Sequence, residues 1–467
     1  MKKQTLLIML LSLLVLSNIA TYFYARSSFF SPSPPAAELP GESSGDELLR
    51  EIRYILEEKY FQPPDEEKML QGAINGMISS LGDPYTAYLN TEAMEDLLIQ
   101  ATGVFSGIGV EITEDEGEIL ILRVIDDTPA SRAGVRQGDR ILEVEGISLF
   151  SMAIEEVARL LRGPDGTEVN FTLSRPEERE LLNMTLTRAQ IERDTVFPRR
   201  LESGLGYIQV TNFDQGTAKS FRNALTTLED EGIEGLIIDF RDNPGGLLDE
   251  AVEMGEFIVP RGEITRVVDR DGNVLNRYLS QAKPRGYPIV LLVNRYTASA
   301  AEIVSGALQD SGKAVLVGTT TFGKASVQYL QYLSGGDGLR YTVARYLTPA
   351  GRDIHRIGLA PDYNIELPAE YYLQNRSVPR DIYPGDTGEK ILLLQTMLGF
   401  LGYPSDVTGV SDEKLFIALD AFRSDHGLPP GSLDDPAREA LRKALSIKCA
   451  EADEQLNYAI ELLLIKN

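Results

Sequence analysis

The chain has 467 residues, 43% of them hydrophobic, which is enough for roughly two to four globular domains. Its formal net charge of −25 argues against nucleic acid as the main partner. Cys449 is the only cysteine, so no internal disulfide can form.

Residues 1–30 predict a membrane anchor or a signal segment. Lys2 and Lys3 precede an apolar run over residues 5–24, which is long enough to cross a bilayer as a helix. The positive flank should stay inside, so that the rest of the chain lies outside the cytoplasm. A cleaved signal peptide is the alternative, which would give a secreted protein rather than a single-pass one at the cell membrane.

Residues 31–45 are rich in Pro, Ser and Gly and read as a linker. Residues 46–102 predict a helical region. Its apolar residues recur at helical spacing, and the expected helices cover residues 46–60, 66–81 and 92–100. Gly82-Asp83-Pro84 ends the second helix. Because so small a region buries little core, we expect it to pack on another surface or on a second subunit.

Residues 103–188 form the next unit. Gly134 and Gly138 suit turns, and residues 141–144 and 153–161 predict a strand and a helix. The run over residues 128–142, with its Thr-Pro-Ala-Ser-Arg-Ala-Gly start, resembles the bacterial PDZ signature. The resemblance implies that small residues upstream surround a peptide's terminal carboxylate with backbone N–H groups, namely Gly107, Ile108, Gly109 and Val110. The alternative is a glycine-rich hairpin without a ligand.

Residues 189–370 predict a catalytic core. Apolar strands over 206–210, 235–240, 289–293 and 314–318 alternate with helices over 218–228, 247–257 and 300–308. This alternation favours a βαβ-type layered fold. An inserted hairpin is expected at residues 265–279.

Residues 381–447 predict a separate small helical unit, and residues 448–467 a final helix that needs a partner surface. The expected helices cover residues 391–401, 411–426, 436–445 and 451–465. The fold class is therefore a multidomain α+β protein.

Ser299 and Lys324 are the candidates for chemistry. Ser299 follows an apolar strand and opens a helix, so its hydroxyl lies beside unpaired backbone N–H groups. Lys324 follows another apolar run, and a lysine kept out of water can lose its proton and act as a base. The alternative is that Ser299 and Glu302 form a capping box and that Lys324 is a surface residue.

Three further features complete the candidate site. Strand alternation places Lys324, Ser326 and Gln328 on one face, so Gln328 can orient the lysine. Asp242-Asn243-Pro244-Gly245-Gly246 opens a helix whose N–H groups can bind negative charge. No sequence context makes His355 or His426 a base, no metal cluster is evident, and nucleotide-binding signatures are missing, so no cofactor is expected.

The surroundings of Ser299 and Lys324 resemble those of the carboxyl-terminal processing peptidases, relatives of the tail-specific proteases. The motifs are Ser-Ala-Ala-Glu at 299–302 and Gly-Lys-x-x-x-Gln at 323–328. The resemblance implies a Ser–Lys serine peptidase with Gln328 as third member and Gly246 and Ala300 as the oxyanion hole. It also implies a dimer formed through residues 46–102 and a role in activation for Arg162. Residues 381–447 resemble the small peptidoglycan-binding-like domain, with departures at Lys414 and Pro436.

The sequence thus predicts an extracytoplasmic serine endopeptidase that recognises protein C-termini through a PDZ domain and forms a homodimer. Its partners would be proteins or peptides with exposed C-termini and, through the tail unit, peptidoglycan. Two alternatives stay open: a catalytically inactive scaffold that binds peptides and the cell wall, and a hydrolase of cell-wall peptides.

Overall fold

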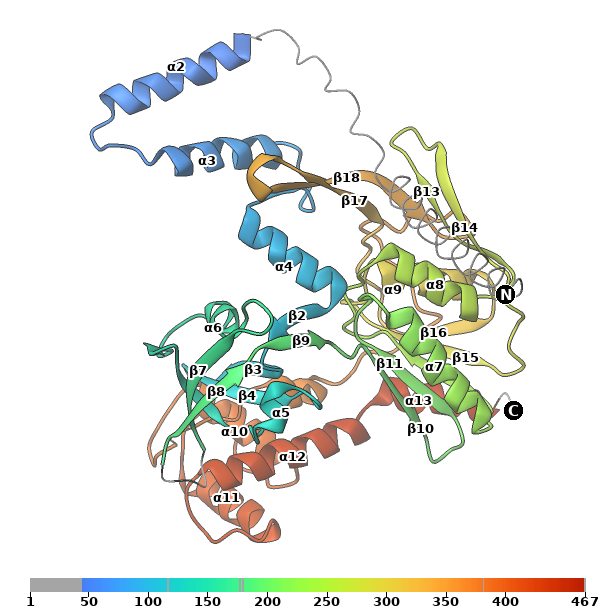
Figure 1. Cartoon of the computed structure of the whole chain (residues 1–467). Coiled ribbons are helices and arrows are strands. Elements are labelled where there is room, and N and C mark those ends of the chain that lie inside the picture. Colours follow the sequence, from blue (N-terminus) through green and yellow to red (C-terminus); the bar gives the residue numbers. More distant parts are fainter. Residues whose placement is uncertain (1–43, 116, 176–177, 179, 381, 466–467) are drawn as a thin grey trace, which may run out of the picture. The chain divides into compact units, whose positions relative to one another are not determined.

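The computed structural model describes residues 44–115, 117–175, 178, 180–380 and 382–465 (Figure 1). The chain divides into two compact units, with the boundary between Leu81 and Gly82. The predicted membrane segment 1–30 and the predicted linker up to residue 43 lie outside the described residues. Among the described residues, no helix combines the length and the apolar character that a membrane crossing requires.

The first unit contains two helices, α2 (Ser44–Lys59) and α3 (Glu66–Ser79), close to their predicted positions. The carboxylate of Asp65 caps α3 by accepting the N–H of Lys68 at 3.1 Å. The apolar side chains of α2 are nevertheless exposed, and α3 buries no residue. The unit therefore presents an apolar surface without forming a core of its own.

The second unit begins with β1 (Ala87–Leu89) and α4 (Thr91–Thr102) and continues into the region predicted to be a PDZ domain. There an antiparallel sheet has the order β3-β4-β5-β7-β8, with β6 beside β5 and with β2 paired to β9. Helices α5 (Pro129–Arg132) and α6 (Ile154–Leu161) pack on a core of buried aliphatic side chains. The strands are β2 (Val104–Gly107), β3 (Val110–Asp115), β4 (Glu118–Val124), β5 (Arg140–Val144), β6 (Ile147–Ser148), β7 (Glu168–Ser174), β8 (Leu182–Thr187) and β9 (Ala189–Glu192).

The core is a six-stranded sheet in the order β10-β11-β12-β15-β16-β19, parallel from β11 onward. The central strands are apolar at successive positions, and successive side chains of a strand point to opposite faces of the sheet. Both faces are therefore apolar. One face packs on α7, α8 and α9, and the other packs on the last helix, α13 (Figure 1). The elements are β10 (Val196–Arg200), β11 (Gly206–Val210), α7 (Thr217–Asp230), β12 (Leu236–Asp239), α8 (Leu248–Ile258), β15 (Ile289–Val293), α9 (Ala300–Asp310), β16 (Ala314–Gly318), β19 (Tyr363–Asn364) and α13 (Glu454–Ile465).

A second sheet adjoins the core in the order β1-β18-β13-β14, and β17 pairs with the same β18. The predicted hairpin is confirmed as β13 (Gly262–Val268) and β14 (Val274–Ser280). Strand β17 (Ser326–Tyr332) lies against the ten-residue β18 (Gly338–Leu347), with a register shift between Val327 and Gln328. A turn of 3-10 helix, η1 (Ser334–Gly336), joins these two strands.

The tail packs around its own apolar core, which is formed by η2 (Ala369–Asn375), α10 (Glu389–Phe400), α11 (Glu413–Asp425) and α12 (Asp435–Glu451). Helix α12 is longer than the predicted 436–445 and leads directly into α13. The tail is joined to the core sheet by a buried ion pair, in which Arg241 contacts Asp453 at 2.8 Å. The predicted partner surface of the final helix is therefore the back of the core sheet.

Candidate active site

Ser299 lies between β15 and α9 in a conformation that is unusual for a serine. Its φ is 56°, in the left-handed region that residues with side chains seldom adopt. The preceding loop is held by Thr297, whose hydroxyl donates to Phe240 O at 2.8 Å. Such an outlier is maintained only where the surroundings fix it, and it is common at functional sites. The backbone thus favours more than a capping role for this serine.

Glu302 connects the two halves of the site. Its carboxylate is fully buried and accepts the backbone N–H groups of Ser299 at 2.9 Å and Lys324 at 2.8 Å. It also accepts the N–H of Gly323 and the hydroxyl of Thr321. Burial raises the pKa of Glu302, and these hydrogen bonds oppose the rise. The sequence identified Glu302 only as a cap, whereas it fixes the serine and lysine segments against each other.

Lys324 lies two residues before the start of β17, half-buried rather than on the surface. Its Nζ lies 5.0 Å from the centre of the Tyr85 ring. Burial lowers the pKa of Lys324, and the positive charge of Arg340 lowers it further, while Glu302 opposes both. The hydroxyl of Tyr346 lies 2.8 Å from the carbonyl oxygen of Lys324 and 3.1 Å from that of Ser299, so a second residue bridges the two segments.

Gln328 lies on β17, as predicted, but Lys324 precedes this strand. The strand alternation that was predicted to place the lysine and Gln328 on one face therefore does not extend to Lys324. The Nε2 of Gln328 donates to Ser326 Oγ at 2.8 Å and to Thr342 Oγ1 at 3.4 Å. Thr342 is directly opposite Gln328 because the register shift leaves Val343 unpaired as an extra residue of β18. The amide group is therefore held by hydroxyl groups on two adjacent strands.

The Gly245–Gly246 loop reaches the backbone at the start of α9. A side-chain carbon on Gly245, where φ is 97°, would lie 2.7 Å from Ser299 Cβ and 2.9 Å from the backbone nitrogen of Ala300. Phe213 holds the loop, since its N–H donates to Gly245 O at 2.9 Å. Among the described residues, no acceptor takes the backbone N–H of Gly246 or of Ala300. The N–H of Ala300 lies in the first turn of α9, directly after Ser299.

The predicted peptide-binding loop lines a cavity between β3 and α6. Gly107, Ile108, Gly109 and Val110 lie on one side of it, and Arg162 and Arg193 also line it. Arg162 ends α6, where its guanidinium lies 5.5 Å from the centre of the Phe105 ring and 3.5 Å from Asp96 Oδ1. Gly109 leaves no room for a side chain, because an added carbon would lie 2.2 Å from Thr128 Cβ.

Arg193 joins this cavity to the catalytic core. Its Nη2 lies 2.7 Å from Oδ2 of Asp214, a carboxylate that is 2% exposed. Asp214 follows Phe213, the residue that holds the Gly245–Gly246 loop. A short chain of contacts thus runs from the cavity to the glycine loop beside Ser299.

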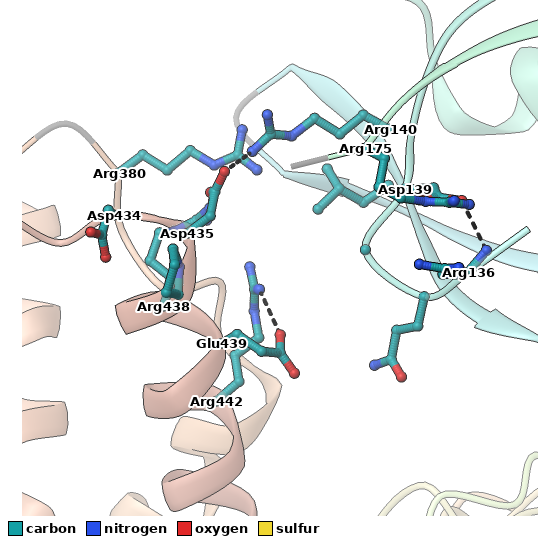
Figure 2. Close-up of a pocket in the computed structure, with 14 residues that line it drawn as sticks. Arg136, Asp139, Arg140, Arg175, Arg380, Asp434, Asp435, Arg438, Glu439 and Arg442 are labelled. Carbon is teal, nitrogen blue, oxygen red and sulfur yellow. Dashed lines mark hydrogen bonds and ion pairs between the residues drawn. The ribbon is translucent and has the colours of Figure 1, made fainter. Parts of the chain in front are cut away.

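A second cavity lies between the predicted PDZ domain and the tail, and its walls are densely charged (Figure 2). Arg140 contacts Asp435 of α12 at 2.8 Å and Glu118 of β4 at 3.3 Å. Arg380 also contacts Glu118, and Arg175 contacts Asp139 at 2.8 Å. Several arginines of the lining thus pair with carboxylates, and the pair between Arg140 and Asp435 joins the two domains across the cavity.

Within the described part of the chain, no group of His, Cys, Asp and Glu side chains is arranged to hold a metal ion. His355 is half-buried, and burial together with the charges of Arg345 and Arg356 lowers its pKa.

Comparison with known proteins places these features in a family context. Residues 204–365 match the model of peptidase family S41, residues 120–175 that of a PDZ domain, and residues 42–93 that of the N-terminal domain of the activating protease CtpB. The carboxy-terminal processing protease CtpA of Bacillus subtilis (strain 168) is 34% identical over 99% of both chains. CtpB of the same organism is 28% identical over 92% of this chain and 93% of its own. The solved structure of a photosystem II D1 C-terminal processing protease is 31% identical, covers 71% of this chain and 88% of its own, and gives a TM-score of 0.42.

Proposed function

This chain belongs to the carboxy-terminal processing proteases of peptidase family S41, which are serine-type peptidases, and we propose that Ser299 and Lys324 carry out its chemistry. The observation that carries the proposal is the shared carboxylate of Glu302, which binds the backbone N–H of each residue. The lowered pKa of Lys324 supports it, because only a neutral amine can accept a proton.

The mechanism follows from these groups. Lys324 takes the proton of Ser299 Oγ as the oxygen attacks the scissile carbonyl carbon, and it then gives that proton to the leaving amine. The N–H groups of Gly246 and Ala300 stabilise the negative charge that develops on the carbonyl oxygen. Water then enters and gives a proton to Lys324 as its oxygen attacks the acyl carbon. Lys324 returns that proton to Ser299 Oγ as the bond between this oxygen and the acyl carbon breaks, which releases the acid product and restores the free enzyme. Gln328 orients the side-chain amine of Lys324.

The PDZ domain supplies recognition of C-termini. We expect a peptide to add as a strand beside β3, with its terminal carboxylate at the N–H groups of residues 107–110. Residues 107–110 line the cavity beside β3, which supports this placement. Arg162 and Arg193 line the same cavity, each beside a carboxylate of the chain.

The segment 1–30 would place the enzyme outside the cytoplasm, at the membrane or secreted. The exposed apolar residues of α2 and α3 support a homodimer. Binding of peptidoglycan by the tail is a prediction from resemblance alone, and sedimentation of the intact chain with purified peptidoglycan is its test.

One experiment separates the proposal from its two alternatives. The purified chain and its Ser299→Ala variant are incubated with an unstructured protein and, separately, with cross-linked peptidoglycan. We expect the parent to shorten the protein and the variant to leave it intact. An inactive scaffold would cleave neither substrate, and a hydrolase of wall peptides would release fragments only from peptidoglycan.

A further inference from the structure

The segment that follows the first unit contributes to the candidate site. Residues 87–89 pair with β18 as an additional edge strand, with Ala87 opposite Arg340. The carbonyl oxygen of Tyr85 accepts Arg340 Nε at 3.1 Å, and the Tyr85 ring lies beside the ammonium of Lys324. The sequence predicted only a helix stop and a turn here.

Asp83 is the acceptor on which this segment depends. Its Oδ2 accepts the hydroxyl of Thr342 at 2.7 Å and that of Thr86 at 2.6 Å, and its Oδ1 accepts the N–H of Tyr85 at 3.0 Å. Although burial opposes the effect, these hydrogen bonds and the nearby His355 hold the pKa of Asp83 below its usual value. The carboxylate is therefore ionised near neutral pH and can only accept hydrogen bonds.

An ionised Asp83 fixes the direction of the next hydrogen bond. A hydroxyl has one proton, and Thr342 uses it on Asp83, so toward Gln328 the Thr342 oxygen can only accept. Gln328 must then present its NH₂ group to Thr342, and that group also reaches Ser326 Oγ. These hydrogen bonds thus set the orientation of the amide, and within the described part of the chain no donor bonds to the carbonyl oxygen of Gln328.

We propose that Asp83, acting through Thr342, orients Gln328 so that its amide oxygen accepts an N–H of Lys324. This inference rests on the proposed Ser–Lys function. With one N–H held by Gln328, the lone pair of the neutral amine is directed by the protein rather than by water. Asp83 and Thr342 are then positioning residues whose loss lowers kcat, and the segment 83–89 is part of the active site.

Thr342→Val is the most direct test, because it removes the hydroxyl and keeps the shape. We expect kcat on an unfolded protein substrate to fall about tenfold, the effect of one hydrogen bond in the transition state, while KM changes less than about twofold. Thr342→Ser keeps the hydroxyl, so its kcat should be close to that of the parent. Thr265→Val is the matched control, because the Thr265 hydroxyl donates to Leu347 O at 2.8 Å in the same sheet, and it should leave kcat unchanged.

A double-mutant cycle separates positioning from a general loss of stability. If Thr342 acts through Gln328, Thr342→Val should slow the Gln328→Ala enzyme no further. Thermal unfolding of each variant shows whether it is folded. The inference would be overturned if Thr342→Val had the kcat of the parent. It would also be overturned if Thr342→Val lowered kcat by the same factor in the parent and in the Gln328→Ala enzyme. Either result would leave the proposed function intact. A parent that cleaves no protein would overturn both.

Discussion

The carboxylate of Glu302 accepts the backbone N–H of Lys324 at 2.8 Å, although 22 positions separate the two residues. Through this contact the first turn of α9 determines where the segment before β17 lies. The same oxygen accepts the N–H of Ser299, so a single buried atom sets the relative positions of the two backbones.

Glu302→Gln should therefore affect both stability and activity. An amide can accept on one side only, and its NH₂ would face N–H groups that are themselves donors. We expect a loss of about 2–3 kcal/mol in the free energy of unfolding, from urea denaturation, and a fall in kcat. Asp362→Asn is the control, since Asp362 accepts the N–H of Leu316 at 2.8 Å elsewhere in the core. Full activity of Glu302→Gln would contradict the account.

Activity should rise with pH through the lowered pKa of Lys324, because only the neutral amine is a base. The charged groups that face this amine are Arg340 and Glu302, with the Tyr85 ring beside it. Lys324→Arg stays charged and should lose at least about 100-fold in kcat/KM at every pH. The measurement is a pH profile of kcat/KM, and a Lys324→Arg enzyme within about tenfold of the parent would exclude lysine as the base.

Stability should follow pH in the same direction. The folded pKa of Lys324 is lowered, so between the folded and unfolded values the unfolded chain binds more protons, and its contribution to stability grows as pH rises. Lys324→Met removes the buried charge and should weaken this dependence. Unfolding by urea from pH 7 to pH 10 compares the two proteins, and parallel curves would contradict the prediction.

Arg162 is expected to couple peptide binding to catalysis. Arg162→Ala should reduce proteolysis, while a peptide with a free C-terminus binds the variant as it binds the parent. Arg159→Ala is a close control, because Arg159 lies on the same helix and pairs with Glu92 of α4, as Arg162 pairs with Asp96. Equal rates for Arg162→Ala and Arg159→Ala would leave Arg162 with only a structural contact.

The final helix should be part of the folded enzyme. Asp453→Ala leaves the buried Arg241 with Asp239 as its remaining carboxylate partner, and we expect a loss of about 3 kcal/mol in the free energy of unfolding. Glu451→Ala breaks an exposed pair with Lys448 and should cost less than about 1 kcal/mol. Thermal unfolding distinguishes the two, and similar small losses would mean that the tail docks only weakly.

The long elements of the core were predictable because their patterns are local. Residues 289–293 are apolar without a break, and the structure buries all five in β15. The helix over 300–308 followed from its start at a serine and a glutamate. Such patterns involve only neighbouring residues. A strand that is buried on both faces is apolar at every position, so its limits can be predicted from the sequence.

The missed features depend on contacts between distant residues. Residues 87–89 follow a turn signal and are too few to show a strand pattern in the sequence. They form a strand because they pair with β18. Thr342 faces Gln328 because Val343 bulges, and nothing in the local pattern of β18 announces the bulge. Glu302 matched a helix-capping pattern. Its hydrogen bond with the N–H of Lys324 joins residues that are distant in the sequence, so a pattern of neighbouring residues cannot predict it.

The most direct measurement of the central claim is the site of covalent labelling. A peptide phosphonate with a free C-terminus would be incubated with the parent and with Ser299→Ala, and the modified residue would be located by mass spectrometry of digests. The account predicts one adduct, on Ser299 of the parent, formed as peptidase activity is lost, and none on the variant. Loss of activity with an adduct elsewhere, or cleavage by Ser299→Ala, would contradict it.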